Sequence, residues 1–172
     1  MRAAALLVVL SLAAALSACG DLSGRYRPSQ IVPPPRVDER TLARYPAGSP
    51  QRAILGWYGT LQRGDAAALR PYYSSRTPFM HPTALRFQVA QARPFFHRVS
   101  LGPLAVDTVR PGSATIVTDL RVRWEAQNGR AQELRSPQSF TLVRERGRWR
   151  FADTYFLRFA SHFKPQKPVP GW

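Results

Sequence analysis

The chain has 172 residues, of which 44% are hydrophobic and 11% aromatic, so it can build one core of ordinary domain size. Its formal net charge is +15, from 25 basic and 10 acidic residues, and this excess favours an anionic neighbour such as lipid head groups or an acidic protein. A solvated, arginine-rich surface is the simpler interpretation of the same charge. The single cysteine, Cys19, excludes an intrachain disulfide and a cysteine metal site.

Residues 1–18 have the pattern of a secretory signal peptide. Arg2 is followed by an apolar run that is short for a membrane span. The run leads into Leu16-Ser17-Ala18-Cys19, which resembles the lipobox of bacterial lipoproteins. That resemblance implies cleavage before Cys19 and acylation of its thiol, hence a protein anchored in a bacterial cell envelope and facing the periplasm. By the same resemblance, Gly20 favours the outer over the inner membrane. An ordinary secretory signal with a chance cysteine is the alternative.

Residues 19–45 are predicted to form a lipidated N-terminus and a spacer. The run Pro33-Pro34-Pro35 favours extended polyproline II geometry, so the body would be held away from the membrane. A short helix within Val37–Tyr45 is the one regular element expected in this segment.

The body is predicted to begin with three helices. Ser49-Pro50 is a typical helix start and Gly64 a typical helix end, with one apolar stripe between them, formed by Ile54, Trp57, Tyr58 and Leu61. Asp65 is expected to cap a short second helix, Ala66–Leu69, which Pro71 limits. The third helix is predicted over Thr83–Arg93 and ends at Pro94, and the residues expected to face inward are Leu85, Val89 and Ala92.

From Phe95 onwards the apolar residues recur with a period of two, which predicts antiparallel strands. In the central strand, Ile116–Trp124, we expect even-numbered residues to face the core and odd-numbered residues to face solvent. Asn128-Gly129 favours a tight hairpin after it, and Arg146-Gly147 a second turn. The other predicted strands are Val99–Val106 with a bulge at Gly102-Pro103, Ala131–Glu145 with Pro137 at an edge or bulge, and Trp149–Phe163.

Helices followed by a long antiparallel sheet resemble the nuclear transport factor 2-like superfamily. The residues that carry the resemblance are Ala53-Ile54-Leu55-Gly56-Trp57-Tyr58, the Gly64-Asp65 step between two helices, and the closing segment from Gly147 to Asp153. The predicted fold class is α+β, with N-terminal helices packed on a curved antiparallel sheet of about four strands. The domain would span residues 46–163, followed by a proline-rich tail over 164–172. The resemblance implies a conical pocket between helices and sheet, in a family that holds isomerases, dehydratases, ligand binders and non-enzymatic subunits.

Asp153 is the best candidate for chemistry in such a pocket. A carboxyl group in apolar surroundings can act as an acid or base, and a tyrosine could supply the hydrogen-bond donor, with Tyr155, Tyr58 and Tyr73 available. The alternative is that Asp153 caps a helix end or pairs with Arg52 or Arg93. The residues expected to line the pocket are Trp57, Tyr58, Leu61, Trp124, Phe151, Asp153 and Tyr155.

Neither a metal nor a cofactor is expected. The three histidines, His81, His97 and His162, do not share the spacing of a metal site, and no phosphate-binding loop or nucleophile motif occurs.

The outer face of the sheet is the other candidate site. Arg121 and Arg123 fall on odd positions, and the anionic-partner face predicted from them comprises Arg121, Arg123, Arg144, Arg146 and Arg150. Lipid phosphate or an acidic envelope protein is the expected partner, and nucleic acid is not. The function favoured at this level is a non-catalytic binding or accessory subunit of an envelope complex, whose pocket could hold a small apolar ligand. The alternatives are a ketosteroid-isomerase-like or dehydratase-like enzyme using Asp153, and a structural subunit that docks through the arginine face.

Overall fold

The computed structural model describes residues 30–77, 81–126 and 128–162, and these form helices packed on an antiparallel sheet. The predicted α+β class is confirmed, with six rather than about four strands in the sheet of the described residues. The order of elements is β1 (Gln30–Val32), α2 (Glu39–Leu42), α3 (Pro50–Arg63), the 3-10 helix η1 (Ala67–Tyr72), α4 (Pro82–Phe96), β2 (Val99–Leu101), β3 (Ala105–Arg110), β4 (Ser113–Glu125), β5 (Ala131–Glu145), β6 (Arg148–Phe151) and α5 (Tyr155–Ser161).

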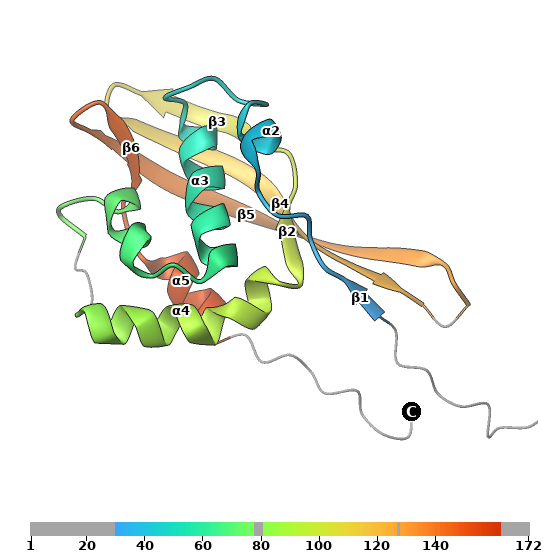
Figure 1. The fold of residues 1–172 in the computed structure, drawn as a ribbon. Coiled ribbons are helices and arrows are strands. Elements are labelled where there is room, and N and C mark those ends of the chain that lie inside the picture. Colours follow the sequence, from blue (N-terminus) through green and yellow to red (C-terminus); the bar gives the residue numbers. More distant parts are fainter. Residues whose placement is uncertain (1–29, 78–80, 127, 163–172) are drawn as a thin grey trace, which may run out of the picture.

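The sheet is built around β4. It pairs with β1, β2 and β3 along one edge and with β5 along the other, and β5 pairs in turn with β6. The predicted alternation is confirmed, because the buried residues of β4 are Ala114, Ile116, Thr118 and Leu120. Figure 1 shows the β4–β5 pair extending beyond the helices as a long arm, with β1 at its edge.

Helix α3 has the predicted bounds and the predicted buried face. Ser49 Oγ accepts a hydrogen bond from the Arg52 backbone N–H at 3.2 Å, and Gly64 ends the helix with a φ of 74°. The four residues of the predicted stripe are each no more than 2% exposed. A polar cap, a terminal glycine and an apolar stripe all agree here, so the helix forms where the sequence predicts it.

Pro94 does not end α4, contrary to the prediction. The helix continues to Phe96, and Phe95 and Phe96 are 3% and 1% exposed. An interior proline costs a helix about 3 kcal/mol. Burial of one phenylalanine stabilises by about 1.5–3 kcal/mol, so two such rings offset the cost. The 3-10 helix η1 likewise runs through Pro71, which was expected to limit it.

The predicted last strand is wrong beyond Phe151. Strand β6 ends there, and the chain turns into α5, which packs against α4 (Figure 1). Phe156, Leu157 and Ala160 are 5%, 0% and 0% exposed, a spacing that places them on one face of a helix. Burial of apolar side chains against α4 therefore decides the conformation of this segment. The alternation of apolar and polar residues beyond Phe151 does not.

The described part of the predicted spacer is attached to the body. Gln30, Ile31 and Val32 pair with the end of β4, and the Gln62 side chain on α3 accepts from the Val37 backbone N–H at 2.9 Å. The short helix expected within residues 37–45 is present as α2. Over the described ranges, no helix combines the length and the apolar character that crossing a bilayer requires.

Candidate functional site

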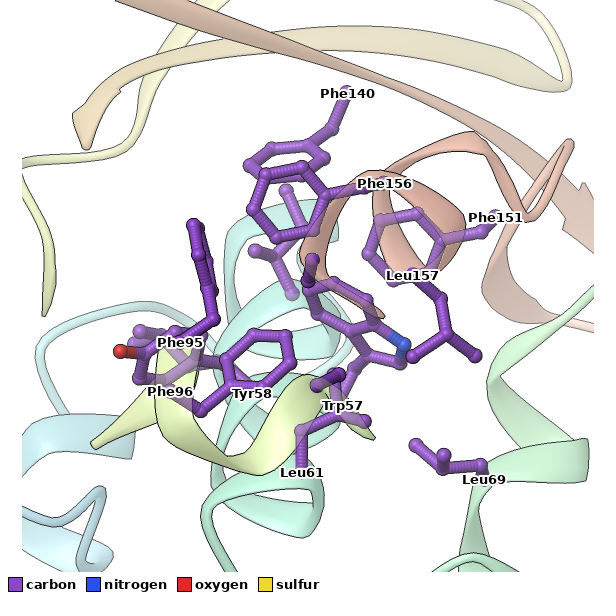
Figure 2. Packing of buried hydrophobic residues seen from close by; sticks show 14 of the residues in the cluster. Trp57, Tyr58, Leu61, Leu69, Phe95, Phe96, Phe140, Phe151, Phe156 and Leu157 are labelled. Atoms are coloured by element: carbon purple, nitrogen blue, oxygen red, sulfur yellow. The ribbon is translucent and has the colours of Figure 1, made fainter. Parts of the chain in front are cut away.

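The space between helices and sheet is filled by aromatic side chains. Figure 2 shows Trp57 surrounded by rings from other elements. Its ring centroid lies 4.5 Å from that of Phe151 on β6 and 5.6 Å from that of Phe156 on α5. Phe96 and Phe140 each lie 6.1 Å from it. The conical pocket expected from the family resemblance is therefore mostly occupied by the protein itself.

A small cavity of about 100 Å³ remains between β5, β6 and α5. Four of the seven predicted pocket residues line it, namely Trp57, Phe151, Asp153 and Tyr155. Its remaining lining residues are Tyr73, Gln138, Ser139, Phe140, Thr141 and Phe156. The cavity thus combines one carboxyl group, hydroxyl groups and aromatic walls.

The other three predicted pocket residues lie elsewhere. Tyr58 and Leu61 are buried in the core, where the Tyr58 hydroxyl donates to the backbone carbonyl of Val99. Trp124 lies in the arm, opposite Ile31 of β1, and is only half-buried. None of these three side chains therefore lines the small cavity.

Tyr73 is the buried hydrogen-bonding group of the cavity. The Trp57 Nε1–H donates to Tyr73 Oη at 2.8 Å, and both side chains are 1% exposed. Burial raises the pKa of the Tyr73 hydroxyl well above its usual value, and the nearby Asp153 carboxylate raises this pKa further. Tyr73 therefore carries its proton at neutral pH. The residue reaches the cavity through a parallel bridge between Tyr73 and Phe151, a pairing between distant parts of the chain.

Asp153 is exposed and lies at the start of α5. Its Oδ1 accepts a hydrogen bond at 2.8 Å from the backbone N–H of Tyr155, the first residue of α5, while the N-cap position itself is Thr154; Asp153 thus contacts the helix end, as the predicted alternative held. Neither predicted arginine pairs with it among the described residues, and Arg52 has Glu39 as its acidic neighbour at 4.0 Å. Asp153 nevertheless borders the same cavity as Tyr73, so a bound molecule could meet a proton acceptor and a proton-bearing hydroxyl together.

Two residues of the predicted arginine face meet on the outer side of the arm. Arg123 Nε lies 2.7 Å from a carboxylate oxygen of Glu133, and Arg121 Nε lies 4.0 Å away. Arg135, which is not among the five predicted arginines, lies 2.6 Å from the same carboxylate. Hydrogen bonds from Arg123 and Arg135 hold the pKa of Glu133 below its usual value.

The other three arginines are elsewhere. Arg150 lies 3.8 Å from Glu145, while the Arg144 guanidinium lies over the ring of Trp149 at 5.9 Å. Arg146 occupies the β5–β6 turn with a φ of 49°. The five predicted arginines thus do not form one face: Arg121 and Arg123 share Glu133 on the arm, and the other three lie near the β5–β6 turn.

No three histidine, cysteine, aspartate or glutamate residues within the described ranges lie close enough to hold a metal ion. Cys19, the signal segment and the proline-rich tail fall outside the residues that the structure describes.

The chain is similar to solved structures at low sequence identity and with TM-scores below 0.5. A protein from Novosphingobium aromaticivorans described as ntf2-like with a cystatin-like fold is 19% identical, with a TM-score of 0.45 over 67% of this chain and 86% of that one. A putative scytalone dehydratase from the same organism is 13% identical, with a TM-score of 0.41 over 60% and 76%. A ketosteroid isomerase-like protein from Erwinia carotovora atroseptica is 14% identical, with a TM-score of 0.39 over 60% and 88%. Neither a family model nor a curated protein matches the chain.

These comparisons correct the leading functional expectation. The sequence pattern favoured a non-catalytic accessory subunit, whereas similar solved structures are described as a putative aromatic ring hydroxylase, a putative scytalone dehydratase and a ketosteroid isomerase-like protein. The expectation is therefore wrong as the leading interpretation. The likeness at this level is one of fold, so any activity of this chain has to be argued from its own residues.

Proposed function

We propose that this protein is a small-molecule enzyme that moves a proton on a carbonyl compound, with Asp153 as the base and Tyr73 as the hydrogen-bond donor. The observation that carries this proposal is the meeting of an exposed carboxylate and a buried, protonated hydroxyl on one cavity. Asp153 would accept a proton from the carbon next to the carbonyl group. Tyr73 would donate a hydrogen bond to the oxygen on which negative charge develops.

The surroundings of the two groups suit these roles. Tyr73 lies among aromatic rings, with the Phe151 centroid 5.8 Å from its own, and a hydrogen bond to a developing negative charge is stronger where water is excluded. Asp153 borders the same cavity and is exposed to water, so its polar side chain is not buried without a partner. The proposed base thus lies where water can solvate its charge, and the proposed donor lies where its hydrogen bond to a negative oxygen is strong.

The size of the cavity limits the substrate. Its volume of about 100 Å³ is smaller than the roughly 150 Å³ of an engineered cavity that holds benzene. A substrate would therefore insert only its carbonyl end. The rest of the molecule would lie over α5, where Tyr155 is 69% exposed.

Deuterium exchange at the α-carbon of small cyclic ketones, followed by proton NMR in D₂O, tests this proposal. Asp153→Asn removes the base but keeps a side chain that can cap α5, so we expect exchange to slow by about 10²–10⁴-fold with stability nearly unchanged. Tyr73→Phe should slow it by about 10²–10³-fold, the cost of one lost donor to the oxyanion. The matched control is Tyr155→Phe, which should retain the rate. A wild-type rate in Asp153→Asn would show that the assignment is wrong.

For the location of this site, we propose a bacterial envelope membrane, with Cys19 acylated after removal of residues 1–18. The support is the lipobox-like sequence that ends an apolar run at the sole cysteine of the chain. Several acyl chains would give lasting attachment, since each buried methylene group contributes about 0.8 kcal/mol. Mass spectrometry of the N-terminal peptide should show a lipid-modified cysteine, and Cys19→Ala should move the protein from the membrane to the soluble fraction. An unmodified Cys19 thiol in membrane preparations would contradict this.

Anionic lipid is the partner that we propose for the arm. Arg121, Arg123 and Arg135 surround the single carboxylate of Glu133, so this cluster keeps a net charge of 3 − 1 = +2. The chain from Cys19 to β1 at Gln30 has 30 − 19 = 11 residue steps, and no conformation spans more than about 3.3–3.6 Å per step. An anchored Cys19 would therefore keep the edge of the arm within about 40 Å of the bilayer.

Co-sedimentation with phosphatidylglycerol vesicles at low salt measures this contact in the unacylated Cys19→Ala protein. Reversal of charge at Arg121 and Arg123 should abolish sedimentation, whereas the same change at Arg110, on the exposed strand β3, should weaken it only slightly. If both changes weaken vesicle binding equally, the binding reflects only the net charge of the protein and not a site on the arm. If the protein binds an acidic envelope protein but not vesicles, the partner of the arm is a protein and not lipid.

A further inference from the structure

A second, larger cavity lies on the opposite side of α3 from the aromatic core. Its volume is about 490 Å³, and none of its lining residues borders the small cavity with Asp153. Ligand pockets in proteins commonly have volumes of about 300–1,000 Å³. Its walls come from four parts of the chain: α2, the first half of α3, η1, and the β5–β6 turn with the start of β6.

Tyr72 packs closely against Gly56 in this cavity. A Cβ atom built at Gly56 would lie 2.8 Å from Tyr72 Oη, so a larger residue there would require the Tyr72 ring to shift. Tyr72 itself is half-buried and packs against the core cluster. Trp149 forms a further half-buried aromatic wall, and Arg144 lies over its ring. Two aromatic side chains are thus fixed at the surface of the cavity.

The polar lining of the cavity is cationic. Arg52 and Arg148 contribute to it, and no aspartate or glutamate does. The nearest carboxylate to Arg52 belongs to Glu39, whose side chain is 89% exposed and lies 4.0 Å away, so water screens this pair strongly. A bound anion could therefore take the place of Glu39 at Arg52. The net charge of +15 would add a long-range attraction for such an anion.

We propose that this cavity binds a small amphipathic anion, a flat apolar body bearing one carboxylate, sulfonate or phosphate group. The aromatic body lies against Tyr72 and Trp149, and the anionic group pairs with Arg52 and Arg148. Guanidinium groups suit this role because they bind planar oxyanions with two parallel hydrogen bonds. The site is separate from the one proposed for proton transfer, and neither proposal depends on the other.

A matched pair of fluorescent ligands tests the chemistry. 8-Anilinonaphthalene-1-sulfonate and N-phenyl-1-naphthylamine share their aromatic body, and only the first carries an anionic group. We expect the native protein to bind the sulfonate at least about tenfold more tightly, the difference that one charge-assisted contact makes. Arg52→Gln and Arg148→Gln should each weaken sulfonate binding by about five- to tenfold and leave binding of the neutral compound unchanged. The control for net charge is Arg110→Gln, on exposed strand β3, which should leave both affinities within about twofold.

Two further variants locate the site. Ala53→Phe and Ala68→Phe fill the cavity from opposite walls, and each should abolish binding of both compounds while the protein retains cooperative thermal unfolding. If one of these two variants fails to fold, the other one and the two arginine variants still test whether the cavity binds the sulfonate. Sulfonate binding that persists in a folded, filled variant would overturn the proposal. So would an equal loss in Arg52→Gln and Arg110→Gln, or no binding by the native protein. Asp153→Asn should bind both compounds as the native protein does, which separates this test from that of the proton-transfer site.

Discussion

Replacing Phe156 by alanine tests whether α5 closes the cone. The Phe156 side chain is 5% exposed, and its ring centroid lies 5.1 Å from Phe140 and 5.6 Å from Trp57. Truncation of a fully buried phenylalanine to alanine costs about 3–5 kcal/mol, the sum of lost transfer free energy and the cavity left behind. With about 4 kcal/mol lost and a urea dependence of about 2 kcal/mol per molar, the unfolding midpoint should fall by about 2 M.

Urea unfolding followed by circular dichroism measures this change, and the same helix supplies the control. Phe159 lies on α5 with 48% of its side chain exposed, so Phe159→Ala should cost only about 1 kcal/mol. Phe156 also borders the small cavity, which should become large enough in Phe156→Ala for an aromatic ring. We therefore expect benzene to raise the midpoint of Phe156→Ala and to leave Phe159→Ala unchanged. If Phe156→Ala and Phe159→Ala lose the same amount of stability, α5 does not pack against the core in solution. The small cavity that α5 borders would then not exist either.

Three further changes test the local contacts. Tyr73→Phe leaves the Trp57 N–H unpaired in the core and should cost about 1–3 kcal/mol, measured by urea unfolding. Gly64→Ala should cost about 1–2 kcal/mol through the left-handed backbone alone, because its added Cβ would meet nothing within 4 Å, and thermal unfolding measures it. Hydrogen bonds from the Ser74 hydroxyl and the Ser75 N–H lower the pKa of Glu145 in the folded protein. The ionised carboxylate therefore stabilises the fold at pH values above the pKa that Glu145 has in the unfolded chain. This stabilisation is lost as the pH falls through the lower pKa that Glu145 has in the folded protein. The melting temperature should therefore fall less steeply below about pH 4 in Glu145→Gln than in the native protein.

The elements predicted correctly are those in which several local signals agree. Helix α3 has a serine cap, a proline at its first position, one apolar stripe and a terminal glycine, and all four act within the helix itself. Strand β4 has strict alternation along its buried part, and the turn at Arg146-Gly147 has the positive φ angles that such hairpins require. No distant part of the chain is needed to specify these features.

The segment that forms β6 and α5 could not be predicted in this way, because its pattern fits two conformations. Trp149 and Phe151 alternate as in a strand, and Leu157 and Phe159 continue that alternation. Ala160, however, falls on a helical face with Phe156 and Leu157. A helix of seven residues has little stability of its own, so packing against α4 decides between them. That packing partner is absent from any local window of the sequence.

The candidate site was only half predictable for the same reason. Asp153, a predicted pocket residue, lines the small cavity, but Tyr73 was one of three tyrosines available, and the bridge that brings it to Phe151 is a non-local contact. The arginine prediction has a different error. Odd-numbered residues of β4 do face outward, whereas Arg144 follows the inward-facing series of Phe140 and Leu142 on β5 and so lies on the other side of the sheet.

Helix α5 links the architecture to the proposed chemistry, because Asp153 serves both. Its carboxylate accepts a hydrogen bond from the first N–H of the helix that fills the cone, and the same helix borders the small cavity beside Tyr73. The two roles separate by substitution. Asparagine can still accept the Tyr155 N–H hydrogen bond, so Asp153→Asn should lose exchange activity but keep its stability, whereas Asp153→Ala should lose both, with a stability cost of about 1 kcal/mol. Loss of activity in the alanine variant alone would mean that Asp153 acts only by positioning α5, and the base would have to be sought elsewhere.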